Sequence, residues 1–261
     1  MIEVTSRDNP LLKSIRRLAQ DPSAYRKHGK IWLEGDHLCR AALERGIKPL
    51  QVVITQGVWQ SAALAWRDIC EQIFVVPDAL FANLSSLESP AQMGFVLDYA
   101  PDPQVLPCMP TIVLDRVQDA GNVGAILRSA SAFGFKQVLA MKGTAALWSA
   151  KVLRAGMGAH FGMNLIEGCS PDSLSQLDTP LITTNSHQGP FLHQLLAQQG
   201  LPSVCAWVMG HEGQGVCEEI MALAQLQVRI AQPGGEESLN VASAAAICLH
   251  ASASAALNSE V

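Results

Sequence analysis

Charged and aromatic residues are scarce in this sequence of 261 residues: Asp, Glu, Lys and Arg make up 16%, and aromatic residues 5%. Long apolar runs are absent too, since the most apolar late stretch, residues 241–257, is short for a membrane span and carries His250. The first thirteen residues lack the apolar core of a signal peptide. With 49% apolar residues, the chain can still bury a core. We therefore expect a soluble, cytoplasmic protein of one large domain or two smaller ones.

Disulfide and metal-ligand patterns are also missing. The seven cysteines are scattered and no two of them form a CxxC pair, which is typical of reduced, buried thiols in an intracellular protein. His187 and His193 are six residues apart with no carboxylate between them, and no HExxH motif occurs. These absences predict a protein without a structural or catalytic metal ion.

Basic residues gather at one end of an acidic chain. The net charge of −5 excludes a globally basic nucleic-acid coat, but residues 1–50 hold ten Lys and Arg against six Asp and Glu. We expect a helix over residues 10–19, on which Lys13, Arg16 and Arg17 would share one face. This face predicts contact with a polyanion. A solvated helix surface is the alternative, and composition alone favours it.

A proline-rich stretch divides the chain. The four prolines in residues 99–110 cannot continue a helix or a central strand, so we expect a semi-rigid linker there. It would separate a domain over residues 1–98 from a domain over residues 111–261. In the first domain the pattern predicts a small α/β fold, with helices over 10–19, 36–45 and 62–71 and strands over 31–34, 52–55 and 73–76.

The second domain alternates regularly between strand and helix patterns. We expect strands over 111–114, 137–141, 181–184, 205–209 and 227–230, and helices over 122–133, 217–224 and from about 239. Such alternation is typical of a mostly parallel sheet covered by helices on both faces. Sheets of this kind bind ligands beyond the carboxyl ends of their strands, and three chemically unusual segments lie there.

The first of these segments follows the strand at 111–114. Asn122 can cap the helix that it begins, and Arg128 lies nearly two turns further on. Only small residues surround Arg128 at the i±3 and i±4 positions, so its guanidinium can lie along the helix and bind a phosphate or a carboxylate. A capped amphipathic helix with one solvated arginine explains this segment equally well.

The other two segments are rich in glycine and in capping residues. Three glycines in residues 210–215 follow an apolar strand and let a ligand approach the backbone, and they enclose the carboxylate of Glu212. Their GxxGxG spacing differs from the GxGxxG dinucleotide fingerprint. Further on, Ser238 and Asn240 precede an Ala-rich helix, and capping explains one of these two polar residues but hardly both.

Taken together, the three segments carry a family resemblance. Asn122 with Arg128, Gly210-His-Glu-Gly213 and Glu237-Ser-Leu-Asn-Val241 resemble, in this order, the three motifs of the SpoU-type (TrmH-like) RNA ribose 2′-O-methyltransferases of the SPOUT class. The resemblance covers residues 111–261. Residues 9–13 and 33–37 are similar to the substrate-binding domain often fused to that family, a smaller, ribosomal-protein-like α/β domain.

The resemblance implies an α/β fold whose C-terminal parallel sheet carries a trefoil knot, and it implies a homodimer. S-adenosylmethionine would bind in the knot, against backbone at Gly210, Ile230 and Leu239, and the backbone near Thr183 and Asn185 would be a further contact. The sequence departs from the family at one place: Ala231-Gln232 follows Ile230, where the family usually has Ile-Pro-Met. Because the family uses backbone there, we expect cofactor binding to survive this departure.

The implied reaction is attack of a ribose 2′-hydroxyl on the sulfonium methyl group. The family role carried onto Arg128 is activation of that hydroxyl. A guanidinium does not give up its proton at neutral pH, so we expect Arg128 to clamp the adjacent phosphate, whose oxygen or a water accepts the proton. Asn122, Ser238 and Asn240 would orient the ribose and Arg128, and Glu212 would fix Arg128 or the loop.

The implied substrate is RNA, whose phosphates would bind to the face formed by Lys13, Arg16 and Arg17. The fused N-terminal domain favours ribosomal RNA, with transfer RNA as the alternative. Two other interpretations stay open. One is a non-catalytic RNA-binding module, and the other is a Rossmann oxidoreductase or an ordinary methyltransferase that uses the same glycine loop.

Overall fold

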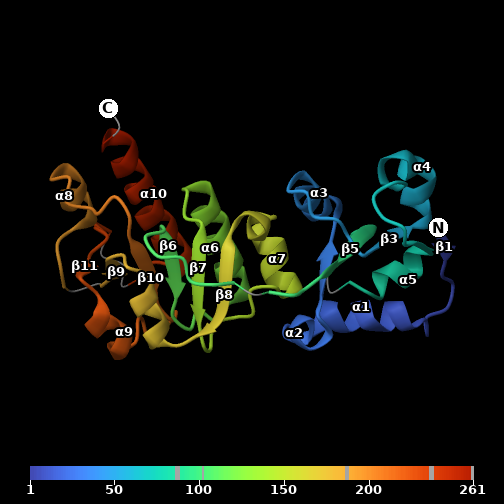
Figure 1. The fold of residues 1–261 in the computed structure, drawn as a ribbon, viewed down its shortest axis with the longest axis horizontal. Coiled ribbons are helices and arrows are strands. Elements are labelled where there is room, and N and C mark those ends of the chain that lie inside the picture. The colour runs from blue at the N-terminus through green and yellow to red at the C-terminus, as the bar shows by residue number, and fades with distance from the viewer. Residues whose placement is uncertain (86–88, 102, 186–187, 235–237, 260–261) are drawn as a thin grey trace. The chain divides into compact units, whose positions relative to one another are not determined.

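The computed structural model describes residues 1–85, 89–101, 103–185, 188–234 and 238–259. The chain forms two compact units, whose helices and strands are labelled in Figure 1. The N-terminal unit consists of Met1–Asp102 and Trp148–Phe161, and the C-terminal unit consists of Pro103–Leu147 and Gly162–Val261. The first boundary falls inside the proline-rich stretch, whereas the sequence pattern does not foresee the return of residues 148–161 to the N-terminal unit.

A five-stranded mixed sheet forms the centre of the N-terminal unit. Its strands are β1 (Ile2–Glu3), β2 (Lys30–Glu34), β3 (Gln51–Thr55), β4 (Ile73–Val76) and β5 (Met93–Asp98). Their order is β1-β4-β3-β5-β2, in which β5 is antiparallel to both neighbours and the other pairs are parallel. The helices that precede the linker are α1 (Pro10–Gln20), α2 (Ala24–His28), α3 (Asp36–Glu44), α4 (Gln56–Trp66) and α5 (Asp78–Ala82). The predicted α/β fold of this region is confirmed.

Helix starts in this unit follow from capping residues. The Asn9 side chain accepts a hydrogen bond from an N–H of the first turn of α1 and Pro10 takes the first helical position, so α1 begins where the sequence predicts. The predicted helix over 62–71 is wrong in its bounds. Helix α4 starts directly after β3 because the hydroxyl of Thr55 accepts a first-turn N–H, and it ends at Trp66.

Residues 148–161 belong to the N-terminal unit although they lie between two strands of the other sheet in the sequence. Their helix α7 (Ala150–Gly156) packs on β2 and α1. The ring of Trp148 packs edge-on against that of Tyr99, with 6.0 Å between the centroids. Burial of apolar and aromatic groups therefore joins segments that are far apart in the sequence.

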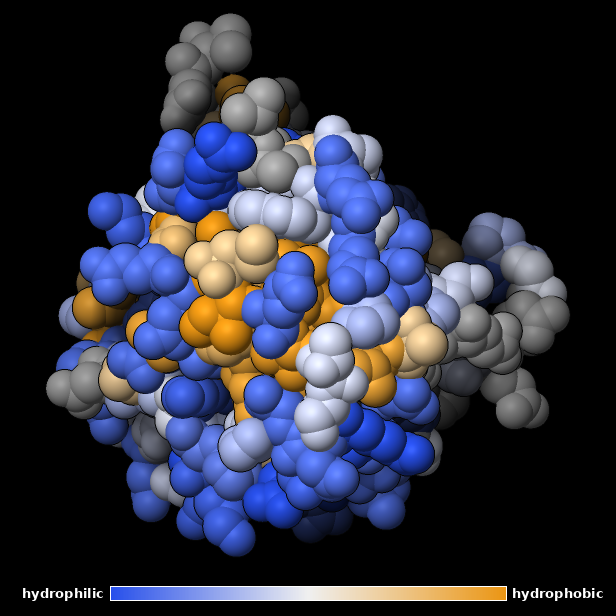
Figure 2. Space-filling view, turned by 90° about the vertical axis from the view of Figure 1, so that its right-hand side faces the viewer, coloured by the Kyte–Doolittle hydropathy of each residue, from blue (hydrophilic) through white to orange (hydrophobic). Residues whose placement is uncertain are grey.

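Apolar residues also gather on the molecular surface. Figure 2 shows one face of the molecule with an apolar patch in its middle and polar residues around it. A patch of this kind is typical of a surface that contacts another molecule.

A six-stranded, fully parallel sheet forms the centre of the C-terminal unit. Its strands are β6 (Thr111–Leu114), β7 (Gln137–Met141), β8 (Asn164–Cys169), β9 (Leu181–Thr184), β10 (Ala206–Met209) and β11 (Leu226–Val228). Their order is β11-β9-β10-β6-β7-β8, and each neighbouring pair is parallel. The other helices of this unit are α6 (Ala120–Ala132), α8 (Leu192–Ala197), α9 (Glu218–Leu223), α10 (Val241–Ser259) and the short 3-10 helix η2 (Pro171–Gln176). A second 3-10 helix, η1 (Ala159–Gly162), has its first three residues in the N-terminal unit. The predicted parallel α/β sheet is confirmed.

Buried central strands and a fixed C-terminal helix position the loops at one edge of this sheet. Strands β6 and β10 pair with each other and are buried along their whole length. Helix α10 packs on α6 and on β10, and the indole N–H of Trp207 donates to the hydroxyl of Ser252 at 2.9 Å. None of the helices in the described part of the chain, α10 included, has the length and apolarity needed to cross a membrane.

Candidate functional site

A cavity of about 560 Å³ opens at the carboxyl edge of the parallel sheet. Its walls are the loop after β10, the end of β9, the segment after β11 and the start of α10. The lining residues are Thr184, Asn185, Met209, Gly210, His211, Glu212, Gly213, Gln214, Gly215, Val216, Ile230, Gln232, Ser238, Leu239, Asn240, Val241 and Ala244. A cavity of this size fits a small-molecule ligand or a cofactor.

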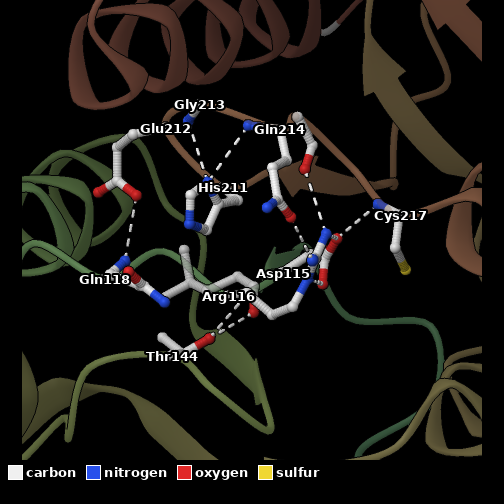
Figure 3. A network of polar contacts seen from close by, with 11 residues as sticks. Asp115, Arg116, Gln118, Thr144, His211, Glu212, Gly213, Gln214 and Cys217 are labelled. Carbon is white, nitrogen blue, oxygen red and sulfur yellow. Dashed lines mark hydrogen bonds and ion pairs between the residues drawn. The ribbon is translucent and has the colours of Figure 1, made fainter.

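The carboxylate of Glu212 ties the loop after β10 to the start of α6 (Figure 3). It accepts the backbone N–H of Gln118 at 3.2 Å, the backbone N–H of Asp119 at 3.0 Å and the side-chain amide of Asn122 at 3.2 Å. Of the two roles that the sequence predicts for Glu212, the geometry agrees with fixing the loop. No contact with Arg128 occurs among the described residues.

Asn122 and Asn240 join the first predicted motif to the third. The side-chain amide of Asn240 donates to the Asn122 side-chain oxygen at 3.0 Å. The Asn240 side-chain oxygen accepts the N–H groups of Ala242 and Ser243, so Asn240 caps α10 as predicted. The predicted capping of α6 by Asn122 is wrong. Asp119 is the cap, and its carboxylate accepts the N–H of Asn122 at 2.8 Å because α6 begins two residues earlier than predicted.

The pKa of Glu212 reflects this set of donors. Partial burial disfavours the charged carboxylate and raises its pKa, but the hydrogen bonds outweigh this effect. The backbone N–H groups of Asp119, of Glu212 itself and of Gln118, together with the Asn122 amide, hold the pKa of Glu212 at about 2. Glu212 is therefore a fixed anion at neutral pH and accepts hydrogen bonds without serving as a proton donor.

The glycine loop folds back on itself. The backbone groups of His211 and Gly215 exchange two hydrogen bonds of 3.0 and 2.8 Å, and the Nδ1 atom of His211 accepts the N–H groups of Gly213 and Gln214. A Cβ atom at Gly210 would collide with the backbone of Gly215. The sequence predicts that a ligand requires glycine at 210, whereas the structure shows that the fold of the loop already requires it.

Two residues of the site escaped the sequence analysis. Asp115 directly follows the strand β6 and is only 2% exposed, and its carboxylate accepts the N–H of Cys217 at 2.7 Å. Arg116 pairs with both oxygens of Asp115 and reaches the side chain of Gln214. The sequence offers one indication of their role, which is an acidic residue followed by a basic residue directly after a buried strand. It does not indicate their partners Gln214 and Cys217, which lie about a hundred residues further along the chain.

Most of the predicted cofactor contacts line the cavity. Gly210, Ile230, Leu239 and Asn185 are all part of its wall. Thr183 is completely buried and its hydroxyl lies 3.3 Å from the sulfur of Met221, so its side chain does not line the cavity. Of the predicted catalytic residues, Glu212, Ser238 and Asn240 line the same cavity, and Ser238 is exposed. Glu237, which begins the third motif, lies outside the described residues.

Arg128 lies apart from this cluster. It is exposed on α6 and is not part of the cavity wall, and its side chain has no hydrogen bond or ion pair among the described residues. Its guanidinium is therefore available to a ligand that approaches from solvent.

The predicted basic face lies on α1 in the N-terminal unit. Lys13, Arg16 and Arg17 line one surface hollow there. Lys13 forms an exposed ion pair of 2.8 Å with Asp8, and Arg16 donates to the backbone oxygen of Asn83 at 3.2 Å. Both contacts are exposed, and an exposed ion pair such as that of Lys13 contributes little free energy, so these side chains can also bind an anion from solution. Across the described residues no group of acidic, histidine or cysteine side chains has the arrangement of a metal site.

The charge of Glu212 predicts a pH-dependent contribution to stability. The pKa of Glu212 is lowered to about 2 in the folded chain. The ionised carboxylate therefore contributes fully to the free energy of unfolding above about pH 4.3, and this contribution is lost as the pH falls towards 2. We expect Glu212→Gln to lower the free energy of unfolding by about 1 kcal/mol at pH 6, a value limited by solvent screening. The difference from wild type should shrink below pH 4 in urea titrations. Glu219→Gln on α9 is the matched control, and a pH-independent difference for Glu212→Gln would contradict this account.

Comparisons with known proteins agree with the geometry. The model of the SpoU rRNA Methylase family matches residues 109–250, and the model of the MRM3-like substrate binding domain matches residues 9–94. The 23S rRNA (guanosine(2553)-2′-O)-methyltransferase RlmP of Bacillus subtilis is 26% identical over 252 residues, which cover 96% of this chain and 98% of that protein. An uncharacterised tRNA/rRNA methyltransferase of Synechocystis is 30% identical over 266 residues, covering 95% and 92%.

A solved structure has the same fold. The AdoMet-bound rRNA methyltransferase from Sinorhizobium meliloti superposes with a TM-score of 0.80 at 24% identity, over 96% of each chain. The resemblance seen in the three motifs is confirmed, because the family model covers more than half of the chain. The chain belongs to the SpoU rRNA methylase family.

Proposed function

We propose that this protein transfers a methyl group from S-adenosylmethionine to a ribose 2′-hydroxyl of RNA, and that ribosomal RNA is its substrate. The observation that carries the proposal is the chain of contacts from Glu212 through Asn122 to Asn240. It brings the three motif segments of a methyltransferase family together beside one cavity. The names of the relatives, among them a 23S rRNA 2′-O-methyltransferase, support ribosomal RNA over transfer RNA.

The cavity has features that suit S-adenosylmethionine. Gly210, Ile230 and Leu239, whose backbone the resemblance assigns to cofactor binding, all line this cavity. The side-chain oxygen of Gln232, in the wall of the cavity, is buried and has no hydrogen-bond partner among the described residues. An unsatisfied buried acceptor is unfavourable, and a ligand with polar N–H groups offers donors that could satisfy it after a small side-chain movement. When bound, the cofactor supplies a methyl group on a sulfonium, which is a good leaving group.

The residues of the chain would then align the substrate and remove a proton. Asn122, Asn240 and Ser238 would orient the ribose, and the exposed guanidinium of Arg128 would clamp the phosphate next to it. The proton of the 2′-hydroxyl would pass to an oxygen of that phosphate or to a water. Glu212, which is ionised at neutral pH, would hold Asn122 in place through the whole reaction.

The proposal has a direct test. Purified protein with tritiated S-adenosylmethionine should label ribosomal RNA fragments, and the label should remain in a nucleoside methylated on the ribose. Labelling of transfer RNA alone would support the alternative substrate. Thermal stabilisation by S-adenosylmethionine or by its demethylated product is expected, and its absence together with RNA binding would favour the non-catalytic binding module. Stabilisation by a nicotinamide cofactor instead would support the oxidoreductase interpretation.

Topology and assembly are part of the same proposal. The strand order, in which β10 lies between β6 and β9, is compatible with a trefoil knot formed by the C-terminal segment. A homodimer would cover the exposed apolar side chains of α10, where Ile247 is 41% and Leu257 67% exposed. Light scattering of the purified protein at micromolar concentration should give the mass of a dimer.

Arg128→Ala should abolish methyl transfer while the affinity for S-adenosylmethionine stays within a few-fold of wild type, because Arg128 is not part of the cavity wall. Arg128→Lys should also fail, since a point charge does not reproduce a bidentate guanidinium. Single-turnover rates and calorimetry measure the two quantities. A lysine variant with near-normal turnover would contradict the phosphate clamp.

Gly210→Ala should weaken cofactor binding roughly tenfold or more, because the new methyl group collides with the returning backbone of the loop and displaces the cavity wall. Gly57→Ala is the matched control, because Gly57 lies in α4 and is not part of the cavity wall. Its Cβ would lie 4.0 Å from the nearest atom, a carboxylate oxygen of Asp78, so the cofactor affinity of this variant should stay near wild type. Calorimetry measures the affinity of both variants for S-adenosylmethionine. Equal affinities would show that the shape of the loop does not determine cofactor binding.

Replacing Lys13, Arg16 and Arg17 together by Gln should remove up to about three phosphate contacts. The slope of log affinity for RNA against log salt concentration should then become shallower by roughly 2–3 units. Affinity for S-adenosylmethionine should not change. Filter binding across a salt series measures the slope, and an unaltered slope would assign these residues to a solvated helix surface.

A further inference from the structure

Arg116 has an unusual backbone conformation at the edge of the cavity-forming loops. Its φ angle is +59°, in the left-handed region that non-glycine residues rarely adopt. Its N–H donates to the hydroxyl of Thr144 at 3.1 Å, and that hydroxyl donates to the carbonyl oxygen of Leu114 at 2.8 Å. The conformation is thus held by a neighbouring turn. Such backbone strain is concentrated at functional sites.

The strained backbone aims the guanidinium of Arg116 at the glycine loop, as Figure 3 shows. Its Nε and Nη2 atoms donate to the two carboxylate oxygens of Asp115 at 3.0 and 3.2 Å. Nη1 donates to the side-chain oxygen of Gln214 at 3.0 Å, and Nη2 lies 3.4 Å from the carbonyl oxygen of Gly215. One side chain therefore joins the loop after β6 to the loop after β10.

Asp115 completes this connection. Its carboxylate is buried, and an isolated buried charge is strongly unfavourable, so the guanidinium of Arg116 compensates for it. The same carboxylate accepts the N–H of Cys217, just beyond the loop. We refer to Asp115, Arg116 and Gln214 as the latch. The hydrogen bond with Asp115 is also the main reason why the pKa of Arg116 is raised.

The latch and Glu212 hold opposite parts of the same loop. Glu212 ties its first half to the start of α6, and the latch ties residues 214–217 to the end of β6. Gln214, Gly215 and Val216 all line the cavity. A glycine-containing loop loses much conformational entropy when it becomes ordered. If the loop is already ordered before the ligand binds, this entropic cost does not reduce the affinity for the ligand.

We propose that Arg116 is a positioning residue for the cofactor: through Gln214 and Gly215 it orders the second half of the glycine loop into the cavity wall before S-adenosylmethionine binds. This inference rests on the proposed function for the identity of the ligand. Arg116 does not itself line the cavity, so it acts through the loop and not by contact with the cofactor.

The test separates this role from a general contribution to folding. Arg116→Gly removes the guanidinium but suits the left-handed backbone, so the relief of strain offsets part of the loss of stability. We expect its dissociation constant for S-adenosylmethionine to rise roughly tenfold, while kcat at saturating cofactor and the KM for RNA stay within about threefold. Amide hydrogen exchange at residues 213–217 of the cofactor-free protein should accelerate. Arg116→Lys should give an intermediate effect, because an ammonium pairs with Asp115 but does not bridge to the loop.

Gln214→Ala provides a second variant that leaves the buried pair intact. Its effect on affinity should be smaller than that of Arg116→Gly, and the two effects should not add in the double variant, since both remove the same contact. Arg40→Ala is the matched control, because Arg40 is an exposed arginine of α3 that also pairs with a neighbouring aspartate. Its cofactor affinity and loop exchange should equal those of wild type.

Unchanged cofactor affinity and unchanged exchange at 213–217 in Arg116→Gly would overturn the inference. So would a loss of kcat with unaltered affinity, because that pattern belongs to a residue acting on the chemical step. If the wild type neither binds S-adenosylmethionine nor methylates RNA, the proposed function fails. The exchange measurement on the cofactor-free protein still decides separately whether Arg116 orders the loop.

Discussion

The candidate site depends on one ionised carboxylate. Glu212 accepts two backbone N–H groups and one side-chain amide, and these three donors come from the segment that starts α6. The loop after β10 and the loop after β6 are joined by the contacts of Asp115 and Arg116 and by this anion. With it, Asn122 is held where it accepts a hydrogen bond from Asn240, so the start of α10 joins the same arrangement. A carboxylate with this many donors is strongly favoured in its charged form.

The parallel sheet explains why such connections are needed. All six strands of the C-terminal unit run in one direction, so the loops that leave their carboxyl ends gather at one edge without ladder hydrogen bonds of their own. Glu212 and the latch of Asp115, Arg116 and Gln214 supply the missing contacts. Both sets are hydrogen bonds to charged groups, which are stronger than hydrogen bonds between neutral groups. These contacts hold the loop segment Gln214 to Val216, which lines the cavity, in one conformation.

The division of the chain into two units separates two kinds of surface. The C-terminal unit carries the cavity and the three motif segments, and the N-terminal unit carries the cluster of Lys13, Arg16 and Arg17. Because residues 148–161 return to the N-terminal unit, the chain passes between the units three times and not once. The N-terminal unit is thus connected by more than the proline-rich stretch.

Local sequence patterns predict the fold class, the three motifs and the family. Strands with strong apolar patterns, such as β6 and β10, and helices with a local cap, such as α1, were predictable because their signals lie within a few neighbouring residues. Elements with weaker signals were not predicted or had wrong bounds. The edge strand β8, whose residues are of mixed polarity, was not predicted, and α4 begins at a Thr55 cap that the pattern did not single out.

The tertiary structure alone decided how the segments meet. It assigned the capping of α6 to Asp119, gave Gly210 a role in the fold of its own loop, and paired Arg116 with Gln214. It also returned residues 148–161 to the other unit. Several of these contacts join residues that are far apart in the chain. Local sequence patterns do not show which distant residues meet, because the packing of the whole sheet determines it.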